Sequence, residues 1–424
     1  MDRVTAYTVD TSVRRYGDVV IGGSPLKLFR LTTAGGRIVD RIAAGEPVPR
    51  STLVDRLQDA GAIHPTPTGG PFTAADVTIV VPTIGRSSAF PPGAIVVDDG
   101  AEPAVPEATV RLDRNRGAAS ARNAGLALVE TPLVAFVDDD VELAEGWLDP
   151  LVAHFADDRV ALVAPRVATA LAAPDGASAG ALAEYERRRS PLDLGTEPAP
   201  IVAGTRVGYV PGAAIVCRTD AVRQLGGFDP DLRFGEDVDL VWRLVRAGWR
   251  CRYEPAAVVH HAPRPSWPAW VRQRVGYGSS AAPLARRHPG MVAPLRMSAW
   301  SIAAWLLVAA RRPVSGAVLA LGSAAALVPK LTDVPPRVAF GLAANGNLRA
   351  GAQLAEAVRR AWWPVLALAA LRSRTARRIL VASAIAARHP LHLADDVAYS
   401  IGVWSGVLGE RTVAPLAPEV IRFP

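Results

Sequence analysis

Short apolar segments alternate with segments of helical periodicity from Asp76 to about Gly290. Residues 77–81, 94–97 and 133–137 each have the length and apolar character of a buried strand. This alternation is typical of an α/β fold in which helices cover a mostly parallel sheet. Because ligands bind beyond the carboxyl ends of the strands in such folds, the residues that directly follow these segments are the first candidates for a functional site.

Acidic residues follow the second and third of these segments directly. Asp98 and Asp99 end one segment, and Asp138, Asp139 and Asp140 end the other. Alternate residues of an extended chain face the same way, so we expect Asp138 and Asp140 to face one ligand while Asp139 faces elsewhere. Carboxylates bind Mg²⁺ or Mn²⁺, which usually bridge to substrate phosphates. An aspartate in a turn can also accept a hydrogen bond from a nucleotide base, and a solvated turn is the alternative for each cluster.

A third acidic pair opens an amphipathic helix. Glu236 and Asp237 precede Val238, Val241 and Leu244, which recur at helical spacing. Acidic residues in a first turn also interact favourably with the helix dipole, so capping is the alternative to a catalytic role. Three acidic sites with this placement indicate an active site that holds a metal and a nucleotide.

Small side chains dominate residues 116–125, which read Arg-Gly-Ala-Ala-Ser-Ala-Arg-Asn-Ala-Gly. A helix that begins with small residues can approach a ligand closely, and the free N–H groups at its N-terminus favour anions. Arg122 adds a charged fork that suits phosphate. Packing between helices is the alternative role for this segment.

Two histidines, His260 and His261, follow a further apolar segment at 256–259. One imidazole can supply the nitrogen ligand that an otherwise acidic site lacks. We predict a metal site formed by Asp140, Asp138 and His261. His260 is the alternative ligand, and a structural role is the alternative for both histidines.

The regions on either side of the α/β region differ from it in character. Residues 1–65 are predicted to form a small separate module. Their pattern indicates strand-like pieces, one helix capped by Thr32 or Thr33 and a second helix capped by Ser51. A segment rich in proline and glycine, residues 66–75, is predicted to be a linker. The α/β domain is then expected to extend from residue 76 to residue 290.

Residues 291–424 form a basic and apolar region. They contain 14 Arg and 1 Lys against 3 Asp and 3 Glu, a net charge of +9, which exceeds the +7 of the whole chain. Their apolar stretches are shorter than the roughly 20 residues of a transmembrane helix. Helices that lie in an anionic membrane surface are one prediction, and a soluble helical cap is the other. We expect no nucleic-acid partner, because no basic stretch is interleaved with stacking aromatic residues.

The cysteine content indicates a reducing compartment. Only Cys217 and Cys251 occur, so no disulfide framework is implied. The first residues contain no apolar run typical of a secretory signal. We therefore expect a cytoplasmic location, at the inner face of the cell membrane where the C-terminal helices contact lipid.

Taken together, the motifs resemble the family 2 glycosyltransferases of the GT-A fold over about residues 76–290. Asp99 matches the acid that contacts the uracil of the nucleotide, and Asp138 and Asp140 match the Asp-x-Asp motif of metal and diphosphate binding. Asp237, beside Glu236, matches the catalytic base. The residues that we assign to the substrates are Pro82, Asp98, Asp99, Gly117, Arg122, Asn123, Asp138 and Gly212.

The resemblance implies inverting transfer of a hexose from a nucleotide-diphospho-sugar, with Mg²⁺ or Mn²⁺ as cofactor. The layout of the whole chain resembles the glycosyltransferases of mycofactocin biosynthesis, and its first module is similar to small winged-helix peptide-recognition units. This similarity implies UDP-glucose as donor, β-1,4-linked glucose as product and a peptide-derived redox cofactor or its precursor as acceptor. The segment Val271–Gly278 departs from the Gln-x-x-Arg-Trp signature of processive synthases, which leaves processivity open.

Three alternative functions remain at this point. A Rossmann-type oxidoreductase is disfavoured, because the first strand is followed by Val81–Arg86 without Gly-x-Gly-x-x-Gly. A non-catalytic binding protein of the same fold is disfavoured by the complete set of acids. The third alternative keeps the fold and changes the substrates, for example rhamnosyl transfer to a cell-envelope lipid or polysaccharide.

Overall fold

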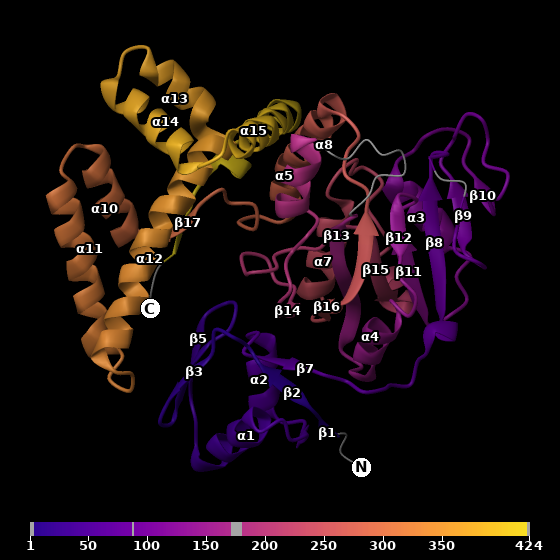
Figure 1. Cartoon of the computed structure of the whole chain (residues 1–424), viewed down its shortest axis with the longest axis horizontal. Coiled ribbons are helices and arrows are strands. Elements are labelled where there is room, and N and C mark those ends of the chain that lie inside the picture. The colour runs from indigo at the N-terminus through magenta and orange to yellow at the C-terminus, as the bar shows by residue number, and fades with distance from the viewer. Residues whose placement is uncertain (1–3, 87–88, 171–179, 422–424) are drawn as a thin grey trace. The chain divides into compact units, whose positions relative to one another are not determined.

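The structure is a computed structural model that describes residues 4–86, 89–170 and 180–421. The chain forms two compact units, residues 1–265 and residues 266–424 (Figure 1). The first unit contains the small N-terminal module and the α/β core, and the second is helical. The predicted fold class, an α/β core with a small N-terminal module and a helical C-terminal region, is thus confirmed.

The small module combines short strands with two helices. Its elements are β1 (Val4–Thr5), β2 (Tyr7–Val9), β3 (Arg14–Tyr16), β4 (Val19–Gly22), β5 (Lys27–Arg30), α1 (Thr33–Ala43), β6 (Val48–Pro49), α2 (Thr52–Asp59) and β7 (Ile63–Pro65). Strands β3, β4 and β5 form an antiparallel sheet, whereas β2 pairs with β7 and β1 with β6. Thr32 caps α1 by accepting a hydrogen bond from the Gly35 N–H at 3.1 Å, and Ser51 caps α2 by accepting one from the Val54 N–H at 3.3 Å.

Ionic contacts join this module to the α/β core within the first unit. Arg250 of the core lies 2.6 Å from Asp59 of the module. Arg206 of the core donates to the buried Asp10 at 2.7 Å, and Asp10 also pairs with His64 at 2.8 Å. Because Asp10 and His64 are buried, these contacts fix the module more firmly than exposed ion pairs would.

A nine-stranded mixed sheet forms the centre of the core. Its order is β10–β9–β8–β11–β15–β13–β16–β12, with β14 paired to β16. The strands are β8 (Val77–Thr83), β9 (Ile95–Asp98), β10 (Val110–Arg111), β11 (Leu133–Val137), β12 (Val141–Leu143), β13 (Val160–Thr169), β14 (Ala199–Pro200), β15 (Ala214–Arg218) and β16 (Arg250–His261). Strands β8 to β11 are mutually parallel, whereas β15 runs antiparallel to β11 and β13. The carboxyl ends of β8, β9 and β11 therefore meet at one edge.

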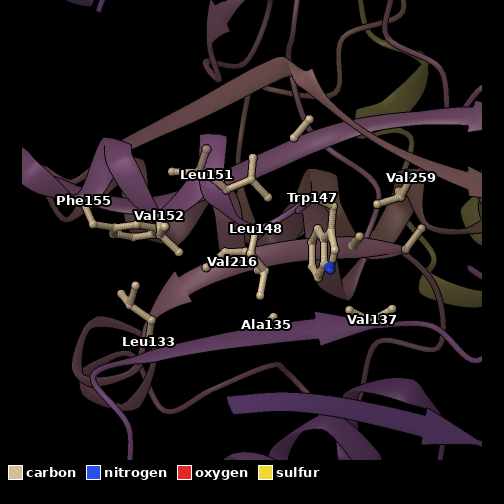
Figure 2. Close-up of a cluster of buried hydrophobic side chains, with 14 of the residues drawn as sticks. Leu133, Ala135, Val137, Trp147, Leu148, Leu151, Val152, Phe155, Val216 and Val259 are labelled. Atoms are coloured by element: carbon tan, nitrogen blue, oxygen red, sulfur yellow. The ribbon is translucent and has the colours of Figure 1, made fainter. Parts of the chain in front are cut away.

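Helices of the core connect these strands and cover the sheet. They are α3 (Ala118–Leu126), α4 (Asp149–Val152), α5 (Ala181–Arg189), α6 (Thr219–Gln224) and α7 (Glu236–Arg246). Figure 2 shows side chains on and around α4, among them Leu148 and Leu151, packed with alternate residues of β11 such as Leu133 and Ala135. Removal of this apolar surface from water holds the strands in place and so fixes the edge where β11 ends.

The second unit consists of packed helices. They are α8 (Trp267–Ser279), α9 (Ala281–Arg287), α10 (Ala299–Ala309), α11 (Pro313–Leu327), α12 (Pro336–Ala357), α13 (Trp363–Ala370), α14 (Arg374–Ala386) and α15 (Pro390–Glu410), with the short strands β17 (Arg296–Ser298) and β18 (Glu419–Ile421). The boundary that we predicted after residue 290 differs from the observed one, because α8 and α9 pack against α15. A Cβ on Gly278 would lie 2.0 Å from the Tyr399 carbonyl oxygen, which shows how closely α8 and α15 approach.

Among the described residues, one segment of this unit, Pro313–Lys330, is long and apolar enough to cross a membrane by length and composition. Only 11% of it is buried.

Candidate active site

Arg122 organises the carboxyl edge of the sheet. This residue lies on α3, is 2% exposed, and donates from its guanidinium to Glu236 Oε1 at 2.7 Å and to Asp138 Oδ1 at 2.6 Å. It also donates to the carbonyl of Gly212 at 3.1 Å. One side chain therefore joins the start of α7, the end of β11 and the loop before β15. We predicted that Arg122 binds phosphate, whereas in the structure both terminal nitrogens of its buried guanidinium donate to protein oxygens and Nε has no partner among the described residues.

Asp237 lies beside this arginine in the first turn of α7. Its carboxylate accepts a hydrogen bond from the Gly212 N–H at 2.6 Å and another from the Val238 N–H at 2.8 Å. A side chain at position 212 would fit tightly and require its neighbours to shift, since a Cβ would lie 3.0 Å from the Arg122 guanidinium and 3.2 Å from Asp237 Cβ. Gly235 has a φ of +81°, which lets the chain turn sharply into the helix so that both acids open it.

The surroundings of Glu236 and Asp237 shift their pKa values. Burial and the charge of Asp237 raise the pKa of Glu236 to about 7, although Arg122 acts in the opposite direction. Burial also raises the pKa of Asp237, while the charge of Arg122 and the N–H of Gly212 lower it. The pair therefore exchanges a proton closer to neutral pH than exposed carboxylates do, which suits a general base.

Asp140 and His261 form the second part of the site. Strand β12 pairs antiparallel with β16, and the register places Val141 opposite His261. This pairing brings His261 Nε2 to 3.3 Å from Asp140 Oδ2. His260 falls on the opposite face of β16, because successive strand residues alternate. Of the two predicted histidines, His261 is therefore the one that lies beside the acid.

Two arginines that sequence reasoning missed surround Asp140. Arg264 lies 3.4 Å from Asp140 Oδ2 and 3.2 Å from His261 Nε2, and Arg86 lies 3.9 Å from the same carboxylate. Burial alone would raise the pKa of Asp140, but His261 and the arginines outweigh it and hold that pKa well below its ordinary value. The available signal was the spacing of Arg264, which follows His261 by three residues.

The consecutive acids Asp138, Asp139 and Asp140 turn to three different partners. Strand β11 ends directly before them, and the Val141 N–H donates to the carbonyl of Asp138 at 3.2 Å, so a turn replaces an extended chain. Asp138 faces Arg122, and Asp139 accepts a hydrogen bond from a threonine hydroxyl of β8 at 2.6 Å. The structure therefore does not support Asp138 as a metal ligand, because residue alternation holds only along an extended chain.

The two aspartates after β9 also have separate roles. Asp98 is fully buried and accepts hydrogen bonds from the Ala101 N–H and the Arg111 guanidinium, both at 2.6 Å. Its carboxylate holds the following loop, so the predicted contact of Asp98 with a substrate is replaced by a structural role. Asp99 accepts hydrogen bonds from the N–H of Gly117 at 2.8 Å and of the residue before it at 2.7 Å. Asp99 thus fixes the start of α3 next to the end of β9.

The remaining predicted residues lie along the same edge. Pro82 lies in β8 opposite Val97 of β9, and Gly117 precedes α3 with a φ of +91°. The Asn123 amide donates to the Phe228 carbonyl at 2.7 Å and accepts from the Phe228 N–H at 2.8 Å. Asn123 therefore holds the loop before α7, and its predicted contact with substrate is replaced by a positioning role.

A metal at this edge has two protein ligands available. The described residues contain no group of three or more His, Cys, Asp or Glu side chains placed to hold a metal ion. Asp140 and His261 nevertheless supply one oxygen and one nitrogen at the end of β16. Mg²⁺ and Mn²⁺ are usually held by one or two protein groups together with substrate phosphates and water, so this donor set fits such an ion when a diphosphate completes the shell.

The edge as a whole combines three chemical functions. Asp237 offers a buried carboxylate base, Asp140 and His261 offer a cation site, and the N-terminus of α3 near Asp99 offers free N–H groups to an anion. This combination suits the transfer of a group from a nucleoside diphosphate to a hydroxyl acceptor.

The chain is similar in sequence to known glycosyltransferases. Residues 93–276 match the family model described as glycosyltransferase like family 2. The chain is 37% identical to the pre-mycofactocin glycosyltransferases of Mycobacterium tuberculosis strains CDC 1551 / Oshkosh and H37Rv, over 98% of this chain and 97% of each relative. A solved structure, the mannosyltransferase PcManGT from Pyrobaculum calidifontis in complex with GDP-Man and Mn²⁺, is 17% identical, with a TM-score of 0.40 over 81% of this chain and 90% of that chain.

Proposed function

The chain belongs to the family of the pre-mycofactocin glycosyltransferases, and from this premise we propose that it transfers glucose from UDP-glucose to a peptide-derived redox cofactor, mycofactocin, or to its precursor. It is a family 2 glycosyltransferase of mycofactocin biosynthesis. The proposed transfer inverts the configuration at the anomeric carbon and links the glucose units β-1,4.

Asp237 is the proposed base of this reaction. The acceptor hydroxyl oxygen attacks the anomeric carbon, Asp237 takes the hydroxyl proton, and the bond from the anomeric carbon to the diphosphate oxygen breaks. The nucleoside diphosphate leaves with the electron pair of that bond. Two observations support the assignment: the carboxylate of Asp237 is oriented by the Gly212 N–H at 2.6 Å, and its pKa is raised by burial.

Arg122 is the proposed organiser of this base. It holds Glu236 and Asp138 at 2.7 Å and 2.6 Å, and its positive charge lowers the pKa values of both acids of α7 against the effect of burial. A fixed charge network of this kind costs no reorganisation when the reaction occurs.

Asp140 and His261 are the proposed protein ligands of a divalent metal. When bound there, Mg²⁺ or Mn²⁺ supplies positive charge that neutralises the leaving diphosphate. The positive groups already near Asp140, Arg264 and Arg86, support an anionic donor at this position. The first turn of α3, which begins just after the two N–H groups that donate to Asp99, supports the nucleotide side of the same donor through its own N–H groups.

The small N-terminal module is the proposed site of peptide recognition. A cavity of about 230 Å³ lies at β5 and α2 and is lined by Lys27, Leu28, Phe29, Arg56 and Asp59. In the described residues β5 pairs with β4 alone, so its other edge has backbone groups available to an extended peptide. These features support a peptide character of the acceptor.

The observation that carries the proposal is the convergence of Asp237, Arg122 and Asp140 at one sheet edge. Product analysis by mass spectrometry tests it: the purified protein is offered UDP-glucose, GDP-mannose and dTDP-rhamnose with Mn²⁺, and either the peptide-derived acceptor or an envelope lipid acceptor. Mass gains in hexose steps from UDP-glucose alone are expected. Gains of a deoxyhexose, or transfer to an envelope lipid acceptor in place of the peptide-derived one, would contradict the proposed substrates, and no gain with any donor would contradict the activity.

A further inference from the structure

Two helical hairpins of the second unit expose aliphatic side chains to solvent. The first hairpin consists of α10 and α11, and the second of α13 and α14 (Figure 1). Exposed aliphatic residues of these hairpins include Val314 (76%) and Val318 (64%) of α11, Leu368 (72%) of α13, Leu371 (77%) just after it, and Val381 (58%) and Ile385 (72%) of α14. On each hairpin these exposed aliphatic side chains lie close together in the sequence, which favours an interaction site over the scattered exposure found on most proteins.

The same hairpins carry positive charge without any acid. Every charged residue within residues 299–327 and 363–386 is an arginine. These arginines are Arg311, Arg312, Arg372, Arg374, Arg377 and Arg378. All six are exposed, and no guanidinium among them makes a hydrogen bond or ion pair with another described residue. We call these six arginines and the six aliphatic residues above the hairpin surface.

Arginines that serve the fold of this unit behave differently. Arg359 is buried, and its guanidinium lies 2.6 Å from the buried Asp396 and also donates to the Ser383 carbonyl at 2.8 Å. Arg274 is likewise buried and lies 2.9 Å from Asp395. Compared with these paired residues, the arginines of the hairpin surface contribute nothing to internal packing.

Helix α14 shows both features on one face. Arg374, Arg378, Val381 and Ile385 are separated by four, three and four residues, so they form one exposed stripe along the helix. The arginines lie in its first turns, where the positive end of the helix dipole repels cations. This placement costs free energy in the isolated protein, and an external anion removes that cost.

We propose that the hairpin surface docks on the anionic face of a lipid bilayer. The arginines contact lipid phosphates, while the aliphatic side chains enter the boundary between head groups and acyl chains. A second copy of the chain would bring an equal positive charge to the same surface, and a nucleic acid would leave the aliphatic side chains in water. A bilayer with anionic lipid is the partner that offers phosphates to the arginines and an apolar environment to the aliphatic side chains.

Sedimentation of the full-length protein with lipid vesicles tests this proposal. We expect binding to vesicles that contain phosphatidylglycerol, weak binding to pure phosphatidylcholine vesicles, and release as salt is raised. The triple variant Arg374→Gln, Arg377→Gln and Arg378→Gln should lower the partition coefficient about 100-fold, at about 1 kcal/mol for each basic residue at an anionic surface. The variant Val381→Ser, Ile385→Ser should weaken the binding that persists at high salt.

A matched control removes three arginines from other surfaces. Arg37, Arg246 and Arg272 are exposed and make no side-chain contact with an acid in the described structure. Their replacement by glutamine should leave vesicle binding within about 3-fold of the wild type. Circular dichroism and glycosyl transfer to a soluble acceptor show whether each variant is folded.

Three results would overturn the proposal. Equal binding to both kinds of vesicle would remove the electrostatic basis, and unchanged binding of the folded arginine variant would place the contact elsewhere. Salt-sensitive binding of RNA with no binding to vesicles, or self-association that the Val381→Ser, Ile385→Ser variant abolishes without any vesicle binding, would identify another partner.

Discussion

The two parts of the candidate active site are built differently. Around Arg122, acidic side chains lie at 2.6–2.7 Å from a buried guanidinium, and Asp237 is held by a backbone N–H at 2.6 Å. Around Asp140, the partners His261 and Arg264 lie at 3.3 Å and 3.4 Å. The fold therefore orients the proposed base before any ligand arrives, whereas we expect the proposed cation site to be completed only with the donor.

Replacement of the base should give the largest change. In Asp237→Asn the amide keeps the shape of the side chain but cannot take the acceptor proton, so we expect kcat to fall about 100- to 10,000-fold. Binding of UDP-glucose should stay within about 3-fold, because the Asp140 part of the site is unchanged. Single-turnover transfer and calorimetric titration of the donor measure the two quantities. Turnover close to that of the wild type would show that Asp237 is not the base.

Removal of the organising charge should affect stability as well as activity. Arg122→Gln leaves the buried Glu236 and the partly exposed Asp138 without their cation, so we expect a loss of about 3–5 kcal/mol in the free energy of unfolding. The exposed control Arg246→Gln should change it by less than about 0.5 kcal/mol. Urea unfolding followed by tryptophan fluorescence compares the two. Equal stability of both variants would mean that Arg122 does not organise the edge.

Removal of a proposed metal ligand should affect only the cation site around Asp140. We expect His261→Ala to weaken binding of Mn²⁺ in the presence of UDP by at least about 10-fold, since loss of a ligand costs no less than loss of an outer partner. His260→Ala is the matched control and should leave the affinity unchanged, because His260 lies on the other face of β16. Calorimetric titration of Mn²⁺ measures both. Equal losses of Mn²⁺ affinity in the two variants would show that His261 is not a metal ligand.

The pH dependence of kcat/KM should be the smallest effect, and it reports on the cluster of Arg122, Glu236 and Asp237. Because the pKa of Glu236 is raised to about 7, lowering the pH through this value adds a proton to the Glu236–Asp237 pair, and kcat/KM should fall. In Glu236→Gln the fall should move to lower pH, because Asp237 loses one of its acidic neighbours and only Asp138 remains. In Arg122→Gln it should move to higher pH, because the cation that lowers both pKa values is absent. The same pH profile of kcat/KM in the wild type and in both variants would show that Glu236 and Arg122 do not influence the titration of Asp237.

Features that depend on residues close together in the chain, such as helix starts, strand ends and helix caps, could be predicted from the sequence. The acids of α7 were found because a helix start is readable from its periodicity, and the carboxyl ends of β9 and β11 were found because apolar strands end where acids begin. The same is true of the caps at Thr32 and Ser51, which depend on residues within three positions.

Contacts between distant segments were not predictable in this way. Arg122 was expected to bind phosphate, but its partner Glu236 lies 114 residues away, and no spacing rule reports such a pair. Asp138 was expected to share a ligand with Asp140, but the chain turns after β11. Asp98 could not be distinguished from Asp99 by sequence, since both are buried and only the fold decides which hydrogen-bond donors each of them meets.

A crystal structure with UDP and Mn²⁺ tests most directly the central claim that both parts of the site act on one donor. The account predicts Mn²⁺ bound to Asp140 and His261, the diphosphate against the start of α3, and the carboxylate of Asp237 still held by the Gly212 N–H and facing the position of the sugar. A nucleotide bound away from this edge, or a diphosphate on the side of the sheet that Asp237 does not face, would contradict it.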